Sequence, residues 1–373
     1  MNAFISFFKR QYVFCIACLC AAASCFFVPP SIHYVNYIDW NTLAMLFSLM
    51  AAVAGFEKCG LFMRTGSVLT TLVHTARGLA AVLVGLCFCT SMFITNDVAL
   101  ITFVPLALLL MQRQKAVPAW VTLYVVVLQT IAANTGSMLT PMGNPQNIFL
   151  FSKTNMGIAL FLKIITPYSV LSAVLIALGL LAVPKIRLAY FTGGAARGMS
   201  VPKWHTFVYA TLFALCLLAV GGIIPKLVLV PIVALTLLFI DRKVLASIDY
   251  WLLLTFCAFF VFSGNIATIP EISAFLKRVV GGNEFLASLI ASQVISNVPA
   301  TLLLYPFVNS TASLLLGVNV GGLGTLVASL ASLISFKLFT KAGGNSGRYL
   351  AVFTALNLLF LAALSGLYAM KLF

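Results

Sequence analysis

Long apolar stretches separated by short polar loops recur along the whole sequence. Many of them approach the roughly 20 residues that a helix needs to cross a lipid bilayer. The apolar runs are continuous and do not alternate with polar residues, which favours helices over a membrane β-barrel. The pattern predicts nine membrane-spanning helices, at about 12–29, 42–57, 119–152, 161–183, 205–221, 226–241, 250–267, 311–338 and 349–371.

Two further apolar segments, about 76–111 and 281–309, contain a polar motif near their middle. The first has basic residues at or beyond both ends, so both ends are expected on the same side of the membrane. We interpret the two segments as re-entrant helical hairpins, the first opening inward and the second outward. Two of the predicted spans are interrupted by Gly- and Asn-containing motifs, at 134–147 and near 319–325, and these spans are predicted to be broken helices.

Several motifs occur twice, in the same order along the chain. The matched pairs are Asp39 with Asp249, Ser91 with Ser292, Asn96 with Asn297, Pro105 with Pro306, Asn134 with Asn319, Gly136 with Gly321, and Thr140 with Thr325. Duplicated polar motifs in an apolar chain are typical of transporters built from two repeats around one polar site. We divide the chain into an N-terminal span (1–37), repeat 1 (38–184), a linker with one span (185–225) and repeat 2 (226–373).

The net charge of +15 arises from 22 Lys and Arg residues against 7 Asp and Glu residues. The basic residues lie in short loops, so we interpret them as orientation signals and expect no nucleic-acid partner. Most of them face the cytoplasm if the N-terminus is cytoplasmic and the C-terminus external, in a multi-pass protein of the inner membrane. This orientation places Asp39 outside and its match Asp249 inside, so the two repeats are predicted to be inverted.

The composition, 62% hydrophobic and 8% charged, leaves no room for a sizeable water-soluble domain. The nine cysteines lie in or beside apolar segments and are interpreted as packing residues. The sequence contains no cluster with metal-ligand spacing and no nucleotide-binding motif, so no metal or other cofactor is expected beyond a coupling ion. Glu57 precedes Lys58 at the end of a span, and we interpret the two as an interfacial ion pair, with a gating role for Glu57 as the alternative.

The four interruptions of apolar structure form the candidate binding site. Irregular backbone at membrane depth is costly unless it lines a cavity, because its polar groups have no water to bind. Free carbonyl groups can hold a cation, whereas amide groups and helix N-termini can hold an anion, and the neutral side chains suit a small oxyanion or carboxylate. The candidate substrate- and ion-binding residues are Thr95, Asn96, Asp97, Asn134, Thr135, Gly136, Ser137, Thr140, Gly143, Asn144, Asn147, Ser296, Asn297, Asn319, Gly321, Thr325 and Ser329.

Asp97 is the one acidic residue at a predicted hairpin tip, and its counterpart in the second repeat is Val298. A charged side chain at the centre of a membrane costs about 3 kcal/mol on insertion scales, which indicates a role. Removal from water favours the protonated carboxyl, so Asp97 is the candidate carrier of a coupling proton, or it binds a cation directly. A structural role, capping the second helix of the hairpin, is compatible with both.

The polar motifs resemble those of the ion transporter superfamily, and most closely its arsenite-permease and citrate-transporter branch. The superfamily also includes divalent-anion/sodium symporters and D-type sodium/proton antiporters. The resemblance is carried by Phe93–Ala99, by Ala133–Ser137 with Pro141–Asn147, and by Ser296–Ala300. It covers about 38–371 and implies inverted repeats, a scaffold, a moving transport domain and usually a homodimer. It also implies that the hairpin tips and broken helices hold substrate and coupling ion.

The two tips differ from those of the symporter branch, which carries Ser-Asn-Thr at both. Here the tips read Thr95-Asn96-Asp97 and Ser296-Asn297-Val298. This departure favours proton coupling through Asp97 over the sodium sites of the symporters.

The sequence therefore predicts a secondary active transporter of a small anion, either a carboxylate or an oxyanion of the arsenite type. Transport is expected to be coupled to H⁺ or Na⁺ and to proceed by elevator-type alternating access. The alternative is a monovalent cation/proton antiporter that uses Asp97. A channel or an intramembrane enzyme has less support, because the sequence shows no nucleophile–base pair. The expected partners are the anionic substrate, the coupling cation, the lipid bilayer and a second copy of the chain.

Overall fold

The computed structural model describes residues 11–71, 73–112, 114, 116–188 and 203–370. This part of the chain is α-helical and contains no strand, only an isolated bridge between Thr75 and Arg187. By length and composition, five of its helices can cross a membrane: α4 (Trp40–Lys58), α8 (Ala119–Ser137), α10 (Ile158–Leu180), α14 (Tyr250–Thr268) and α20 (Ser346–Ala369). Shorter apolar helices accompany them, so the chain is an all-α polytopic membrane protein.

The shorter helices fill the remaining predicted apolar segments. They are α2 (Tyr12–Cys25), α6 (Ala76–Ser91), α7 (Asn96–Gln112), α9 (Pro145–Thr154), α11 (Lys203–Val220), α12 (Lys226–Ile240), α16 (Glu284–Ile295), α17 (Asn297–Leu304), α18 (Thr311–Gly321) and α19 (Leu330–Lys341). Short connecting helices are α3 (Tyr34–Tyr37), α5 (Leu61–Thr71), α13 (Arg242–Ser247), α15 (Pro270–Val280) and the 3₁₀ turn η1 (Tyr305–Phe307).

Both predicted hairpins are pairs of packed helices that meet at the predicted polar tip. α6 and α7 are joined by residues 92–95, and α16 and α17 are joined at Ser296. Both predicted helix breaks are also present. α9 begins with Pro145, whose missing N–H would find no partner in the first turn of a helix anyway. The second break lies at 322–329, a few residues after the predicted position, because Asn319 stays helical.

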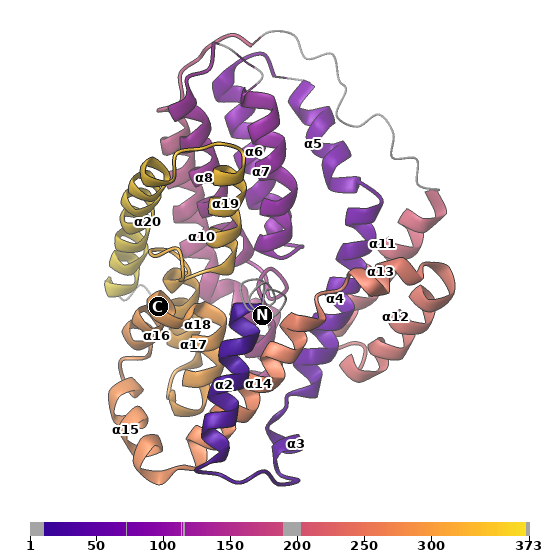
Figure 1. Cartoon of the computed structure of the whole chain (residues 1–373), viewed down its shortest axis with the longest axis vertical. Helices are drawn as coiled ribbons and strands as arrows, with labels where there is room; N and C mark the ends of the chain where they lie inside the picture. Colours follow the sequence, from indigo (N-terminus) through magenta and orange to yellow (C-terminus); the bar gives the residue numbers. More distant parts are fainter. Residues whose placement is uncertain (1–10, 72, 113, 115, 189–202, 371–373) are drawn as a thin grey trace, which may run out of the picture.

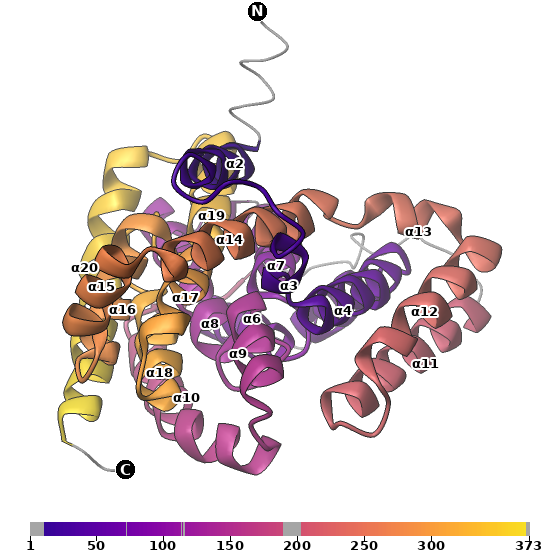
Figure 2. The same ribbon diagram turned by 90° about the horizontal axis from the view of Figure 1, so that it is seen from below.

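The helices form two groups in space. α6, α7, α8 and α10 pack together with α19 and α20, and α16, α17 and α18 lie at one end of this bundle (Figure 1). α4 packs against α11 and α12 in a second group, which Figure 2 shows beside the bundle. α14 packs against α2 and α17 and also contacts α4, so it connects the two groups.

The matched acidic residues Asp39 and Asp249 have the same structural role. Each precedes a long apolar helix, and its Oδ1 accepts a hydrogen bond from the backbone N–H three residues later, at 3.0 Å from Thr42 and 3.1 Å from Leu252. This is the N-cap geometry, which satisfies one of the amide groups left unbonded at the start of a helix. The repeated motif therefore marks the start of corresponding helices, α4 and α14.

The expected ion pair between Glu57 and Lys58 is wrong. Lys58 Nζ instead donates to Asp241 Oδ1 at 2.6 Å, which ties α4 to the α12–α13 junction. Neighbouring residues on a helix point in directions about 100° apart, so adjacent side chains do not face each other. Glu57 has no ion pair with the described lysines and arginines whose side chains are placed.

Some predicted features lie outside the described residues. These are the orientation signals within 1–10, 113, 115, 189–202 and 371–373, together with part of the predicted linker 185–225.

Candidate functional site

Each hairpin packs on a broken helix through a glycine and a serine. A Cβ added to Gly136 of α8 would lie 2.2 Å from the Phe88 carbonyl oxygen and 2.6 Å from Ser91 Oγ of α6. In the second repeat, a Cβ at Gly321 of α18 would lie 2.9 Å from Ser292 Oγ of α16. Small residues allow helices in a membrane to approach this closely. The matched Gly and Ser residues of the sequence therefore make matched contacts.

The matched threonines provide a second shared contact. Thr140 Oγ1 donates to the Met92 carbonyl oxygen, just before the first tip. Thr325 Oγ1 donates to the Gln293 carbonyl oxygen, just before the second tip, at 2.9 Å. Each bond holds the irregular segment of a broken helix against the end of the first hairpin helix. These threonines therefore position the tips.

Hydrogen bonds also cross between the two broken helices. Asn319 Nδ2 of α18 donates to Asn147 Oδ1 of α9 at 2.7 Å, and Asn134 Nδ2 of α8 donates to Ser332 Oγ of α19 at 3.3 Å. Asn147 and Ser332 occupy matched positions of the two repeats, as do Asn134 and Asn319. The first half of each broken helix thus binds the second half of the other.

Asn134 extends this network to the first tip. Its Oδ1 accepts hydrogen bonds from Asn96 Nδ2 at 2.9 Å and from Ser329 Oγ at 3.0 Å. All three side chains are buried. Residues from a hairpin tip and from both broken helices are therefore joined at one point.

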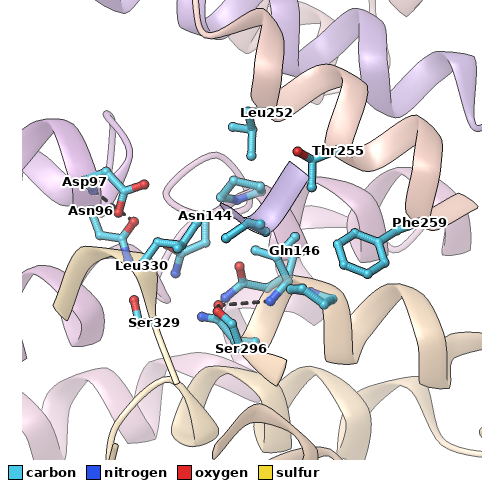
Figure 3. A pocket seen from close by; sticks show the side chains of 15 residues that line it. Asn96, Asp97, Asn144, Gln146, Leu252, Thr255, Phe259, Ser296, Ser329 and Leu330 are labelled. Carbon is cyan, nitrogen blue, oxygen red and sulfur yellow. Dashed lines mark hydrogen bonds between the residues drawn. The ribbon is translucent and has the colours of Figure 1, made fainter. Parts of the chain in front are cut away.

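A cavity lies where the tips and the breaks meet (Figure 3). Its volume is about 40 Å³, which accommodates a few water molecules or a small ion. It is lined by Val13, Asn96, Asp97, Asn144, Pro145, Gln146, Leu252, Thr255, Phe259, Ser296, Asn297, Val298, Pro299, Ser329 and Leu330. We call it the central cavity.

Four helix N-termini contribute to the central cavity. α7 and α17 begin at the two hairpin tips with Asn96 and Asn297, and α9 and α19 begin after the two breaks with Pro145 and Leu330. In each hairpin, the tip asparagine accepts a hydrogen bond from the next backbone N–H, at 3.0 Å in α7 and 2.9 Å in α17. α9 and α19 have no side-chain cap. Each N-terminus carries roughly half a positive charge, so the cavity attracts anions.

Buried polar atoms without hydrogen-bond partners lie in the wall of this cavity. Gln146 is 1% exposed, and neither Oε1 nor Nε2 has a partner among the described residues. Asn144 Oδ1 and Asp97 Oδ1 are also buried and unpartnered. An unpaired polar atom in the protein interior costs about 1–3 kcal/mol, so such groups are typical of a site that a ligand completes. Asp97 is the one ionisable residue among those lining the cavity.

The second tip has an unusual backbone conformation. Ser296 has φ 74° and ψ 154°, a region that is populated almost only by glycine. The bond from Asn297 N–H to the Ala328 carbonyl oxygen, at 3.0 Å, holds the tip against the second break. A residue kept in this region costs about 1–3 kcal/mol, and such strain is concentrated at binding sites.

The structure brings many of the predicted site residues together, in three different positions. Lining the cavity are Asn96, Asp97, Asn144, Ser296, Asn297 and Ser329. Supporting its wall through the contacts described above are Asn134, Asn147, Asn319, Thr140, Thr325, Gly136 and Gly321. Others face elsewhere: Thr135 and Ser137 bond to carbonyls of their own helix, Gly143 packs on the Ser137 backbone, and Thr95 lines a neighbouring cavity.

Sequence reasoning did not select some of the lining residues. Gln146 lies within the polar motif before Asn147 and was recognisable from its neutral amide group. Leu252, Thr255 and Phe259 project from α14 toward the segment that carries Asn144 and Gln146 (Figure 3). No signal in the sequence marked these α14 residues, because they belong to an ordinary apolar helix.

Comparison with known proteins identifies the family of this chain. The family model described as citrate transporter matches residues 9–334. The chain is 33% identical over 309 residues to the inner membrane protein YbiR of Escherichia coli K12, covering 81% of this chain and 80% of that protein. It is 32% identical over 321 residues to an uncharacterized transporter of Methanocaldococcus jannaschii, covering 85% and 86% of the two chains. The chain therefore belongs to the citrate transporter family of membrane transport proteins.

Proposed function

We propose that the protein is a secondary active transporter of a small anion, coupled to H⁺ or Na⁺. The observation that carries this proposal is the convergence of four helix N-termini on the central cavity. Their partial charges sum to roughly two positive charges, against the single negative charge of Asp97 when it is ionised. A small anion is therefore favoured, and protonation of Asp97 or a cation bound beside it strengthens anion binding further.

The neutral groups of the cavity fit a carboxylate or an oxyanion that also carries hydroxyl groups. The unpartnered Gln146 Nε2 is a hydrogen-bond donor for an anionic oxygen. The unpartnered Gln146 Oε1 and Asn144 Oδ1 are acceptors, and they require an O–H or N–H group from the ligand. No lysine or arginine is among the described lining residues, so recognition relies on helix ends and amide groups.

Alternating access follows from an inverted arrangement of the two repeats. In our proposal there are nine spans and two re-entrant hairpins, and the central cavity lies near the middle of the membrane. The matched contacts of Gly136 and Gly321 and the reciprocal bonds of Asn134 and Asn319 support a twofold relation between the halves. Rigid-body motion of the hairpin bundle against the group of α4, α11 and α12 would then carry the site between the two sides.

A second candidate is a monovalent cation/proton antiporter that exchanges its ions at Asp97. The observation in its favour is the single carboxylate of the cavity, with one buried oxygen free of hydrogen bonds. In this mechanism the cation and the proton compete for the same carboxylate, and no anion is moved.

Transport by the purified protein in lipid vesicles distinguishes the two candidates. A panel of radiolabelled anions, including citrate and arsenite, is tested for uptake driven by a pH or sodium gradient, and a pH-sensitive dye inside the vesicles records proton movement. Anion uptake that saturates with concentration supports the first candidate. Cation-driven proton release without uptake of any anion supports the second. The family membership already makes the chain a transporter and not an enzyme.

Substitutions at the cavity test the assigned roles. We expect Asp97→Asn to abolish coupled transport and to leave folding intact, because it removes one charge and hardly changes the side-chain volume. Asn96→Ala and Asn297→Ala are each expected to raise KM, whereas the exposed Asn36→Ala is a control that leaves it unchanged. Unchanged pH and sodium dependence in Asp97→Asn would exclude this residue as the coupling site.

The homodimer and the cytoplasmic N-terminus stay predictions. Size-exclusion chromatography with light scattering measures the oligomeric state. Reporter proteins fused to the two termini show on which side of the membrane each terminus lies.

A further inference from the structure

A second cavity, with a volume of about 280 Å³, adjoins the central cavity. Asp97, Pro145 and Leu252 line both cavities, so the Asp97 carboxyl group lies in the wall that they share. The rest of the lining comes from α4, the first hairpin tip, α7, the first helix break, α9, the α13–α14 junction and α19. We call this space the acidic vestibule, because its ionisable lining residues are Glu57, Asp97 and Asp249.

The charge of this lining is opposite to that of the whole chain. The protein has 22 Lys and Arg residues and only 7 Asp and Glu residues. Nevertheless, three carboxylates and no described lysine, arginine or histidine line the acidic vestibule. An enclosed space lined by one sign of charge concentrates the field and raises the local concentration of the opposite ion.

Among the residues whose side chains the structure describes, no lysine or arginine forms an ion pair with Glu57, Asp97 or Asp249. Lys58, the neighbour of Glu57, is bound to Asp241 at 2.6 Å, and the other ion pair of the described side chains joins Lys153 to Asp39. Asp97 Oδ1 is buried and has no hydrogen-bond partner. The carboxyl group at the inner end of the vestibule is thus free to receive a ligand.

Other charged or titratable groups near Asp97 lie outside the vestibule. Tyr12 of α2 is close enough to interact electrostatically with Asp97. Lys337 of α19 lies over the Tyr12 ring, with Nζ 5.9 Å from the ring centroid. Asp249, the N-cap of α14, and Glu57 of α4 line the vestibule together with Asp97. The groups on the vestibule side are therefore all acidic.

We propose that the acidic vestibule is the path by which the coupling cation reaches Asp97, with Glu57 and Asp249 attracting it at the outer end. This proposal rests on the proposed function, in which Asp97 binds that cation. Glu57 and Asp249 are both exposed, whereas Oδ1 of Asp97 is buried. Glu57 is adjacent in sequence to Lys58, and Asp249 follows Arg242 and Lys243 by a few residues. These basic residues place the vestibule mouth on the expected cytoplasmic side.

Charge-selective labelling of a thiol inside the vestibule tests the path. Thr95 lines the vestibule but not the central cavity, and Thr95→Cys is a small change that keeps Asp97. In inside-out membrane vesicles, the labelling rates of this thiol by the cation 2-aminoethyl methanethiosulfonate and by the anion 2-sulfonatoethyl methanethiosulfonate are compared. Mass spectrometry of the peptide separates the introduced thiol from the native cysteines.

We expect the cationic reagent to label the thiol several-fold faster than the anionic one, relative to their rates with a free thiol. Adding Glu57→Gln and Asp249→Asn should lower this ratio at least threefold, and 0.5 M salt should have the same effect because it screens charges. Asparagine is a good N-cap, so Asp249→Asn keeps the start of α14. The control Glu271→Gln removes an acid that is not in the vestibule and should leave the ratio unchanged.

An unchanged ratio in the double variant, or faster labelling from right-side-out vesicles, would overturn the proposal. Labelling that is slower in a sodium buffer than in a choline buffer of equal ionic strength identifies Na⁺ as the cation that the vestibule delivers. Equal labelling rates in the two buffers identify H⁺ instead. Failure of the proposed function is a separate outcome. In that case Asp97→Asn retains coupled transport while the labelling ratio still depends on Glu57 and Asp249.

Discussion

Replacement of Gly136 by alanine tests whether close packing of α8 on the first hairpin holds the site together. The added methyl group would lie 2.2 Å from the Phe88 carbonyl oxygen, more than 1 Å short of the 3.4 Å of ordinary contact. The obstacle is backbone, so rotation of a side chain cannot remove it. α8 must therefore move away from α6 by about 1 Å, and overpacking of this kind costs about 1–3 kcal/mol. We place Gly136→Ala at the upper end of this range.

Two further glycines give a graded comparison. In Gly321→Ala, the nearest atoms are the Ser292 side chain at 2.9 Å, so a smaller shift suffices and we expect a loss of about 1 kcal/mol. Gly85 is in the interior of α6, and an added Cβ meets no atom within 4 Å. Gly85→Ala should therefore stabilise the protein by about 0.5–1 kcal/mol, because alanine favours the helix.

The assay is thermal unfolding of the purified variants in one detergent, followed by the loss of monodisperse protein. From the lowest to the highest Tm, we expect the order Gly136→Ala, Gly321→Ala, the unsubstituted protein and Gly85→Ala. A shift of about 1 Å in α8 would also break the 2.9 Å hydrogen bond from Asn96 to Asn134, so Gly136→Ala should raise KM as well. A Gly136→Ala protein with the Tm and KM of the unsubstituted protein would refute the packing argument.

Two other substitutions address the strained second tip and the ion pair between Lys58 and Asp241. Ser296→Gly should raise Tm, because it relieves about 1–3 kcal/mol of backbone strain. It should also raise KM, because the tip becomes mobile. An unchanged Tm would show that the tip is not strained. Burial acts to raise the pKa of the Asp241 carboxyl, but hydrogen bonds from Lys58 and Tyr209 and the charge of Lys58 hold it below its ordinary value. The ion pair therefore stabilises the fold above about pH 4 and is lost as the pH falls further, so Asp241→Asn should lower Tm at pH 7 and much less at pH 3. A Tm difference that is independent of pH would show that the charge of Asp241 is not responsible.

The sequence was sufficient to locate most of the helices and all four interruptions. Long apolar runs indicate that these segments lie in lipid. In a bilayer, the backbone of each segment must form its hydrogen bonds internally, so the helical conformation of the segments follows from their composition alone. The ends of the hairpin helices were predictable for a related reason. Asn and Ser at the tips provide side-chain hydrogen bonds to free backbone groups, as Asn96 and Asn297 do in the structure.

The functions of individual polar residues were only partly predictable. The duplicated motifs combined lining residues such as Asn96 with packing residues such as Gly136, and a sequence pattern does not separate the two. Glu57 and Lys58 are adjacent in the chain, and the expected pair between them is wrong because Lys58 binds Asp241, which is far away in sequence.

The sequence by itself determined that the chain is a helical membrane protein with duplicated polar interruptions, because hydrophobicity and backbone hydrogen bonding act locally. Only the tertiary structure decided which side chains of these interruptions contact one another and which other residues surround them. The reciprocal bonds of Asn134 with Ser332 and of Asn319 with Asn147, the α14 residues in the cavity wall and the acidic vestibule all join residues from distant parts of the chain. Their proximity depends on how helices pack, which is set by the complementary shapes of whole helix faces and not by any single motif.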